Sequence, residues 1–325
     1  MRDRVAEQPA HREDSCMNAG TEVVPEYGSP EPPAGRGTPP AWFSAALRRE
    51  RHTGEVDVGG VPIRFLAWGE PGSPATILVH GGAAHAMWWA PIAARLDPDS
   101  YVVALDLSGH GCSGHRPVYA VEHWAEEIAA VAEAVSPAPA TVVAHSLGGI
   151  VTSCAMTRAD LAGRFRRAVL VDAPVWPDAA APEQPLADRE IRPHRTYANA
   201  AEALGRFRLV PPQPCDNDWY VEHIAWHSLR PVAPSGWQWR FDPRIFANPT
   251  GDHRITRFEG SLDRAGCPFA VVMGERSYLA PGARAALADR PGTPLRFVPD
   301  AAHHVMLDQP LALLSQLRDL LGSWP

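Results

Sequence analysis

Short apolar runs that recur between helical patterns constrain the fold of this 325-residue chain more than any other feature. The sequence predicts buried strands at residues 75–79, 101–105, 141–144, 168–171 and 269–273. Apolar runs without polar alternation are typical of strands that are covered on both faces of a parallel sheet. Helical patterns lie between them, for example at residues 121–135. The alternation of strands and helices therefore predicts a doubly wound α/β fold.

The pattern divides the chain into four segments. Residues 1–40 are predicted to be disordered, because Pro and Gly dominate the stretch 25–40 and supply little apolar surface to offset the entropy of ordering. Residues 41–173 are predicted to form the first part of the α/β core. The alternation stops between 174 and 263, where Pro, Arg, Trp and His are frequent, so this segment is predicted to be a helical cap insertion. Residues 264–325 are predicted to complete the core.

Charge and cysteine content exclude several classes of partner. The net charge is −7 and no block of Lys and Arg is present, so nucleic acid is not an expected partner. No apolar run reaches the roughly 20 residues that cross a bilayer, and no membrane association is expected. The five cysteines are scattered without metal-ligand spacing, and no secretory pattern is visible. We expect a cytoplasmic protein without a bound metal.

A strand, a sharp turn and a helical pattern meet at Ser146. The run AHSLGG at 144–149 lies between a predicted strand and a helical pattern. In this context a GxSxG motif indicates a nucleophilic serine, and here Ala144 stands in place of the first glycine. A serine hydroxyl becomes a good nucleophile only when a base removes its proton, and such a turn exposes the hydroxyl to a base. The sequence predicts Ser146 as a nucleophile.

A second glycine-rich loop, HGGA at 80–83, follows the strand predicted at 75–79. Acyl transfer through a tetrahedral intermediate needs two donors aimed at the developing oxyanion. We assign these donors to the N–H groups of Gly82 and Leu147.

Two adjacent histidines near the C-terminus compete for the role of base. The segment DAAHHVMLDQP at 300–310 follows a predicted strand, and a base must come from a loop at the carboxyl edge of the sheet. His303 is preferred because the segment resembles a His-x4-Asp/Glu-x-Pro pattern. His304 is the alternative base, or otherwise a wall of the substrate pocket.

Four motifs in a fixed order resemble the α/β-hydrolase superfamily. They are HGG at 80–82, DLSGHGCSG at 106–114, HSLGG at 145–149 and HHVMLDQP at 303–310, and the resemblance covers residues 55–321. It implies an eight-stranded, mostly parallel sheet and no metal or organic cofactor. It also implies a catalytic triad in the order Ser, acid, His, as in a serine esterase with a cap.

The acid is where this chain departs from the commonest pattern of that family. Many members carry an Asp in the segment that is GERS at 274–277 here, and Ser277 stands in its place. Some branches, including haloalkane dehalogenases, take the acid from the strand that in this chain ends before Asp172. We therefore predict Asp172 as the acid, with Glu275 as the alternative.

The predicted activity is hydrolysis of a carboxylic ester through an acyl-enzyme. Trp88 and Trp89 follow the HGG loop and are predicted to contact an apolar or aromatic acyl group of a small-molecule substrate. Two other functions are open: hydrolysis of a carbon–carbon bond in a diketone-like compound, and non-catalytic binding of a small molecule on the same scaffold. The altered residues Ala144 and Ser277 motivate the second of these.

Overall fold

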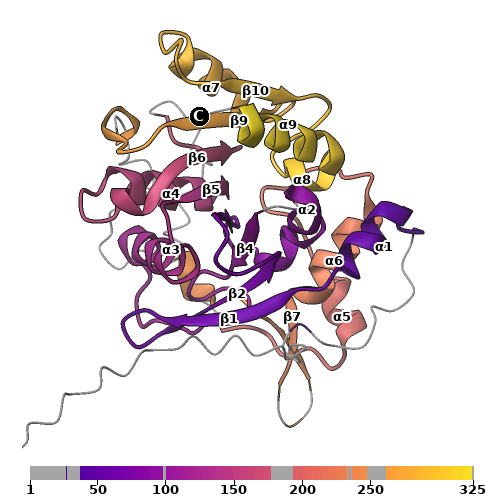
Figure 1. The fold of residues 1–325 in the computed structure, drawn as a ribbon. Coiled ribbons are helices and arrows are strands. Elements are labelled where there is room, and N and C mark those ends of the chain that lie inside the picture. Colours follow the sequence, from indigo (N-terminus) through magenta and orange to yellow (C-terminus); the bar gives the residue numbers. More distant parts are fainter. Residues whose placement is uncertain are drawn as a thin grey trace, which may run out of the picture.

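The computed structural model describes residues 27, 37–97, 100–176, 193–232, 234, 236–246 and 261–323. In this part of the chain an eight-stranded sheet has helices on both faces (Figure 1). Across the sheet the order is β1 (His52–Asp57), β2 (Pro62–Trp68), β4 (Tyr101–Leu105), β3 (Ala75–Val79), β5 (Ala140–His145), β6 (Phe165–Val171), β9 (Phe269–Gly274) and β10 (Leu295–Val298). β2 pairs antiparallel with β1 and β4, and the remaining neighbours are parallel. The predicted fold, with a mostly parallel eight-stranded sheet, is confirmed.

Alternate side chains of the central strands enter two separate hydrophobic cores. On β3, Ile77 and Val79 belong to one cluster of buried residues and Leu78 to the other. Successive side chains of a strand point to opposite faces of the sheet. The uninterrupted apolar runs in the sequence therefore reflect strands that are covered on both sides.

Each face of the sheet has its own set of helices. The cluster that contains Leu78 also takes side chains from α1 (Ala41–Leu47), α2 (Ala90–Leu96), α8 (Val305–Asp308) and α9 (Pro310–Ser323). The other cluster takes side chains from α3 (Val121–Val135), α4 (Leu147–Thr157) and α7 (Ala280–Leu287). Among the helices of the described residues, none has the length together with the apolar character that a membrane crossing requires.

The segment between β6 and β9 does not add strands to the main sheet. It contains α5 (Ala200–Leu204) and α6 (Asp218–His227), and a small sheet of β7 (Leu229–Pro231) and β8 (Trp237–Trp239) (Figure 1). Residues 177–192 and 247–260 of the predicted cap lie outside the described residues. Of residues 1–36, only Tyr27 is described: it is buried, and its hydroxyl donates to the carboxylate of Asp106.

Burial keeps several histidine side chains neutral in the folded protein. Loss of hydration lowers the pKa of His85 and His110 well below the ordinary value and lowers the pKa of His223 to about 4. In an unfolded chain a histidine titrates near pH ~6.5. Below that pH the unfolded state therefore binds more protons than the folded state. The folded state consequently loses stability relative to the unfolded state as the pH falls.

We expect the free energy of unfolding, measured with urea, to fall between pH 7.5 and pH 5.5. Each such histidine contributes up to about 1.4 kcal/mol for each pH unit below its unfolded-state value. A His223→Gln variant removes one of these groups and should show a shallower pH dependence. An unfolding free energy that does not change over this range would contradict the prediction.

Candidate active site

Ser146 lies at the sharp turn between β5 and α4. Its backbone has φ +52° and ψ −119°, a conformation that L-residues rarely adopt. Two glycines on α4 allow this turn. A Cβ on Gly148 would lie 2.6 Å from the carbonyl oxygen of His80, and a Cβ on Gly149 would lie 2.3 Å from the Cβ of Ala173. The helix packs against the adjoining loops only because these two side chains are missing.

A chain of hydrogen bonds joins Ser146, His303 and Asp172. The Nε2 atom of His303 is 3.0 Å from Ser146 Oγ, and its Nδ1 atom is 2.8 Å from Asp172 Oδ1. A carboxylate only accepts hydrogen bonds, so Nδ1–H donates to Asp172. In the neutral imidazole Nε2 then carries no proton and accepts a hydrogen bond from the Ser146 hydroxyl. The structure thus brings together three side chains that follow β5, β6 and β10.

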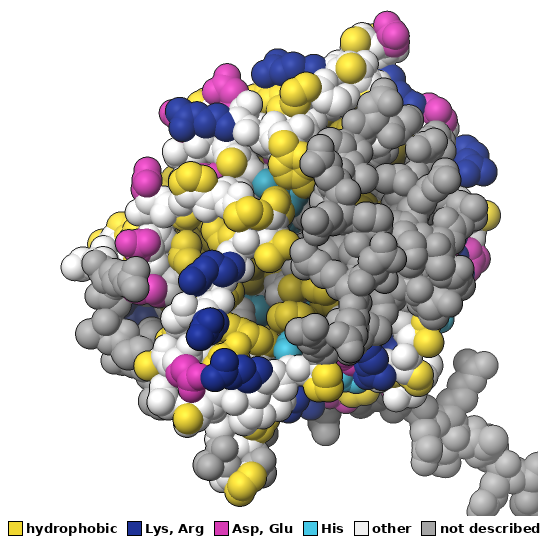
Figure 2. Space-filling view, turned by 180° about the vertical axis from the view of Figure 1, so that it is seen from behind, with side chains coloured by type: hydrophobic (Ala, Val, Ile, Leu, Met, Phe, Trp, Pro, Cys, Tyr) yellow, Lys and Arg dark blue, Asp and Glu magenta, His cyan; other side chains and the backbone are white. Residues whose placement is uncertain are grey.

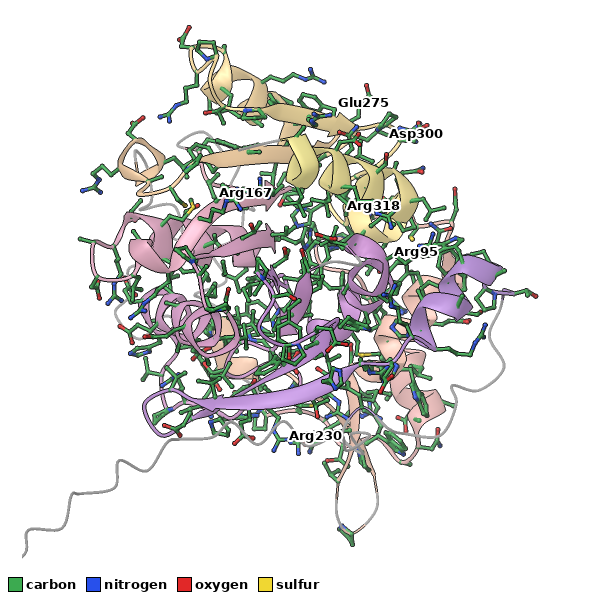
Figure 3. All side chains as sticks on the ribbon, viewed as in Figure 1. Arg95, Arg167, Arg230, Glu275, Asp300 and Arg318 are labelled. Atoms are coloured by element: carbon green, nitrogen blue, oxygen red, sulfur yellow. The ribbon has the colours of Figure 1, made fainter. Side chains whose placement is uncertain are left out.

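Asp172, and not Glu275, is the carboxylate beside the imidazole. Asp172 is fully buried, has φ +44°, and accepts bonds from Gly274 N–H at 2.7 Å and Ser277 Oγ–H at 2.6 Å. Glu275 is exposed and lies at the outer edge of the molecule near Asp300 (Figure 3). The alternative assignment of the acid to Glu275 therefore does not fit the geometry.

The two amides assigned to the oxyanion lie on adjoining loops. A Cβ on Gly82 would lie 3.6 Å from the Leu147 side chain, and a Cβ on Gly81 would lie 3.2 Å from the Cβ of Ser146. Within the described residues, neither the Gly82 N–H nor the Leu147 N–H donates to another protein group. Both donors are therefore available to an oxygen atom bound next to Ser146.

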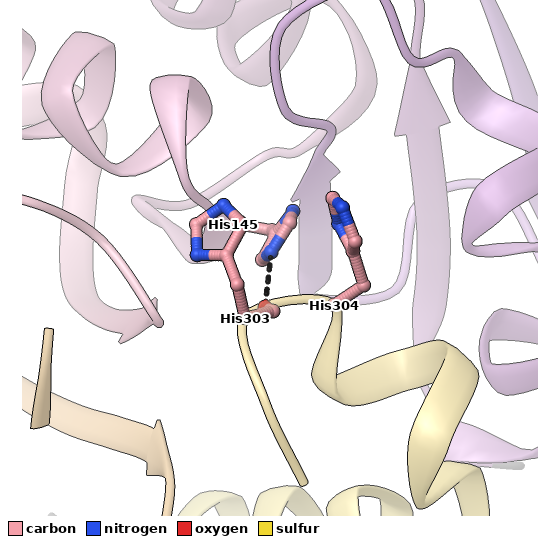
Figure 4. Close-up of side chains that lie close together, drawn as sticks. All are labelled: His145, His303 and His304. Atoms are coloured by element: carbon pink, nitrogen blue, oxygen red, sulfur yellow. Dashed lines mark hydrogen bonds between the residues drawn. The ribbon is translucent and has the colours of Figure 1, made fainter. Parts of the chain in front are cut away.

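Three histidine rings cluster together (Figure 4), and one of them, His303, bonds the Ser146 hydroxyl. His145 Nε2–H donates to the carbonyl of His303 at 2.9 Å, and His304 Nε2–H donates to the carbonyl of Pro211 at 3.1 Å. Burial, and then the charges of His303 and His304, lower the pKa of His145 well below its usual value. Burial, and then His303, lower the pKa of His304 to about 3. Both rings are therefore neutral near pH 7.

Among the described residues this cluster brings three imidazoles as close together as metal ligands would be, although both ring nitrogens of His303 already bond to Ser146 and Asp172. One ring nitrogen from each of His145, His303 and His304 lies within 4.8 Å of the other two. His145 Nδ1 and His304 Nδ1 have no hydrogen-bond partner among the described residues. The sequence predicted no metal ligands here, because His145 is distant in sequence from the other two.

The segment between β6 and β9 is fastened to both loops that carry the site. On α6, the Tyr220 hydroxyl donates to the carbonyl of Trp88 at 2.8 Å. Just before it, the Asn217 amide donates to the carbonyl of Leu307 at 2.7 Å. These bonds join the segment to the loop after the HGG motif and to α8, which follows His303.

Aromatic side chains surround the reacting groups. The Trp88 ring is 5.5 Å from that of His304, whereas Trp89 is fully buried in the core. Sequence reasoning missed two further residues. The ring centroid of Tyr278 is 5.5 Å from that of His303. The ring of Phe246 comes within 3.5 Å of the point where a Cβ on Gly82 would lie. Neither residue belongs to a motif. Figure 2 shows histidine side chains lying among hydrophobic ones on this molecule's rear face.

Comparisons with known proteins agree with this architecture. One similar protein is the 2-succinyl-6-hydroxy-2,4-cyclohexadiene-1-carboxylate synthase of Serratia proteamaculans (strain 568), which is 26% identical over 79% of this chain and 97% of that protein. A serine hydrolase-like protein of Danio rerio is 28% identical, and the match covers a third of each chain. The crystal structure of an esterase from Mycobacterium tuberculosis superposes with a TM-score of 0.66, with 25% identity over 87% of this chain and 97% of that one.

A family model covers most of the chain. The model of the alpha/beta hydrolase family matches residues 76–317, which include the HGG loop, the serine turn, the segment between β6 and β9, and the histidine loop. The order and pairing of the eight strands agree with the sheet expected for that family. This chain belongs to the alpha/beta hydrolase family.

Proposed function

We propose that this hydrolase cleaves a carboxylic ester through a covalent acyl-enzyme on Ser146. The observation that carries the proposal is the continuous chain of hydrogen bonds from Ser146 Oγ through His303 to Asp172, beside two amides without protein acceptors. A nucleophile, a base within hydrogen-bond reach and a group that orients the base are the parts that acyl transfer requires.

Each part has one role in the proposed reaction. Ser146 Oγ attacks the carbonyl carbon while Nε2 of His303 takes its proton. The N–H groups of Gly82 and Leu147 stabilise the negative oxygen of the tetrahedral intermediate. The imidazolium then gives the proton to the departing alcohol, and Asp172 stabilises the charged ring. Water repeats the same steps on the acyl-enzyme and releases the acid.

The surroundings of the serine favour an apolar or aromatic acyl group. Trp88, Phe246 and Tyr278 contribute aromatic surface near His304, Gly82 and His303. The two neutral histidines add no charge that would retain an anionic substrate. We propose that residues of the segment between β6 and β9 cover the acyl group as a cap, since that segment is bonded to both loops of the site. The M. tuberculosis esterase, which shares the fold over most of both chains, supports the reaction class.

Labelling with a fluorophosphonate tests the proposal directly. Such a probe reacts with a serine that is activated by a base. We expect one label per chain, located at Ser146 by peptide mass spectrometry, and none in a Ser146→Ala variant. A panel of p-nitrophenyl esters of graded acyl length then measures turnover. Folded wild-type protein that is not labelled would contradict the proposal and favour the non-catalytic binding function.

The two tryptophans after the HGG loop should respond differently to substitution. Trp88 lies next to His304, so we expect Trp88→Ala to change the preferred acyl length on the ester panel. Trp89 is fully buried, so Trp89→Ala should lower the free energy of unfolding by about 3–5 kcal/mol. An acyl-length preference that changes only in Trp89→Ala would reverse these assignments.

A further inference from the structure

Tyr27 lies outside the part of the chain that the family model covers, yet its side chain is buried inside the described structure. The family model matches residues 76–317, and only 5% of the surface of Tyr27 is exposed. Its hydroxyl donates to the carboxylate of Asp106, which directly follows β4. Its ring also lies against His227, the last residue of α6. A residue that precedes the hydrolase fold therefore fills a space between the core and the segment that contains α6.

The space around Tyr27 is built like a binding site for a phenol. The ring centroid lies 5.9 Å from that of His85 and 5.8 Å from that of His227. Burial lowers the pKa of both histidines well below the ordinary value, so two neutral rings flank the phenol. The Cζ atom of Arg240 lies 5.3 Å from the Tyr27 ring centroid, within the range of a cation–π contact. Burial, and then the charge of Asp106, raise the pKa of Tyr27 well above its usual value, so the hydroxyl keeps its proton and donates.

The carboxylate that receives the phenol also holds the loop of a proposed oxyanion donor. Asp106 Oδ1 accepts the N–H of Ala86 at 2.7 Å. Its Oδ2 accepts the N–H of Cys112 at 2.8 Å in addition to the Tyr27 hydroxyl. Ala86 lies four residues after Gly82 in the same loop. The place of the Gly82 N–H therefore depends on the place of this carboxylate.

The loop that the carboxylate holds is also the surface on which α6 lies. His85 Nε2–H donates to the carbonyl of Ile224 at 3.2 Å, and His223 Nε2–H donates to the carbonyl of Met87 at 3.2 Å. Both bonds, like that of Tyr220, join α6 to the residues just after the HGG motif. Loss of the phenol would leave a cavity between this loop and α6, and a buried carboxylate with one donor fewer.

We propose that this space is a binding site for a phenol, filled here by the chain's own Tyr27, and that its occupant positions the loop that carries the Gly82 N–H. Tyr27 is thus a positioning residue that acts through Asp106. Its effect on turnover rests on the proposed ester hydrolysis, whereas the binding of a phenol does not. Once the tyrosine side chain is removed, a free 4-substituted phenol takes its place.

Thermal unfolding of a Tyr27→Gly variant tests the site without turnover. 4-Methylphenol is the side chain that this substitution removes, and toluene is the same molecule without the hydroxyl. A compound that binds only the folded state raises the Tm. We expect 4-methylphenol to raise the Tm of Tyr27→Gly, toluene at equal concentration to raise it less, and neither to raise that of wild type, in which the site is filled. Equal shifts with the two compounds, or no shift with 4-methylphenol, would overturn the proposal.

Steady-state hydrolysis of the best ester of the panel tests the positioning role. We expect Tyr27→Gly to lower kcat by about 10- to 100-fold, less than the roughly 10²- to 10³-fold loss of an oxyanion donor itself, with little change in KM. 4-Methylphenol should restore most of this kcat, and toluene should not. Tyr27→Phe removes only the oxygen, so it keeps the role testable if the cavity of the glycine variant unfolds the protein. It should show part of the loss and no response to 4-methylphenol. A kcat of wild type in either variant would refute the role.

The two readouts separate this inference from the proposed function. Wild-type protein that neither hydrolyses the esters nor takes the fluorophosphonate label would defeat the proposed hydrolysis, and the Tm of Tyr27→Gly would still report whether the phenol binds. A Tm of Tyr27→Gly that does not respond to 4-methylphenol would defeat the phenol site even in an active enzyme.

Discussion

Replacing His303 with Ala is expected to lower kcat for ester hydrolysis by about 10⁶-fold, the loss seen when the base of such a unit is removed. The physical reason is that Nε2 of His303 is the acceptor 3.0 Å from the Ser146 hydroxyl. Without it the serine keeps its proton and the leaving alcohol receives none. The measurement is steady-state hydrolysis of the best ester of the panel, with the labelling rate as a second readout.

His304→Ala is the matched control for this prediction. The two histidines are adjacent and equally buried, but His304 uses its Nε2–H to bond the carbonyl of Pro211, whereas it is His303 that bonds the Ser146 hydroxyl. Its loss should change KM or acyl preference and leave most of kcat. A variant ranking in which His304→Ala loses more kcat than His303→Ala would transfer the role of base to His304.

Replacing Asp172 with Asn is expected to lower kcat by about 10⁴-fold, through the wrong tautomer of the imidazole. The Gly274 N–H donates to one carboxylate oxygen, and the amide must offer its only oxygen to that donor. Its NH₂ group then faces Nδ1 of His303, which becomes an acceptor. The proton moves to Nε2, and the ring can no longer take the proton of Ser146.

Glu275→Gln makes the same carboxylate-to-amide change at the alternative acid, two residues before Ser277. Glu275 is exposed at the edge of the molecule (Figure 3). The kcat of the Glu275→Gln variant should therefore stay within about twofold of wild type, as for most surface changes. Both variants are assayed on the same ester at saturating concentration. The reverse ranking of the two would show that Glu275 supplies the negative charge during turnover.

Much of the fold could be predicted because it depends on local patterns. The strands β3, β4 and β9 begin where the apolar runs begin, since a strand covered on both faces has no polar position to interrupt it. The serine turn was equally visible, because only small residues at 148 and 149 allow the helix to pack so closely on the adjoining loops. These signals lie within a few residues of the feature they predict.

The partners of these features depend on contacts between distant segments. The sequence favoured Asp172 as the carboxylate for His303 but kept Glu275 as an alternative. Strand pairing separates the two, because β6 and β9 are neighbours and the turn after each strand sends Asp172 inward and leaves Glu275 in solvent. The same pairing gave Ser277, which in the sequence was only a missing Asp, a hydrogen bond to the acid.

By itself, then, the sequence determined the strand and helix alternation, the turn at Ser146 and the short list of groups able to act with it. The tertiary structure decided which members of that list lie within hydrogen-bond reach of one another. The physical reason is range: side-chain periodicity and turn sterics act over a few residues, whereas the 2.8 Å contact between His303 and Asp172 joins residues separated by 131 positions and exists only once the sheet has assembled.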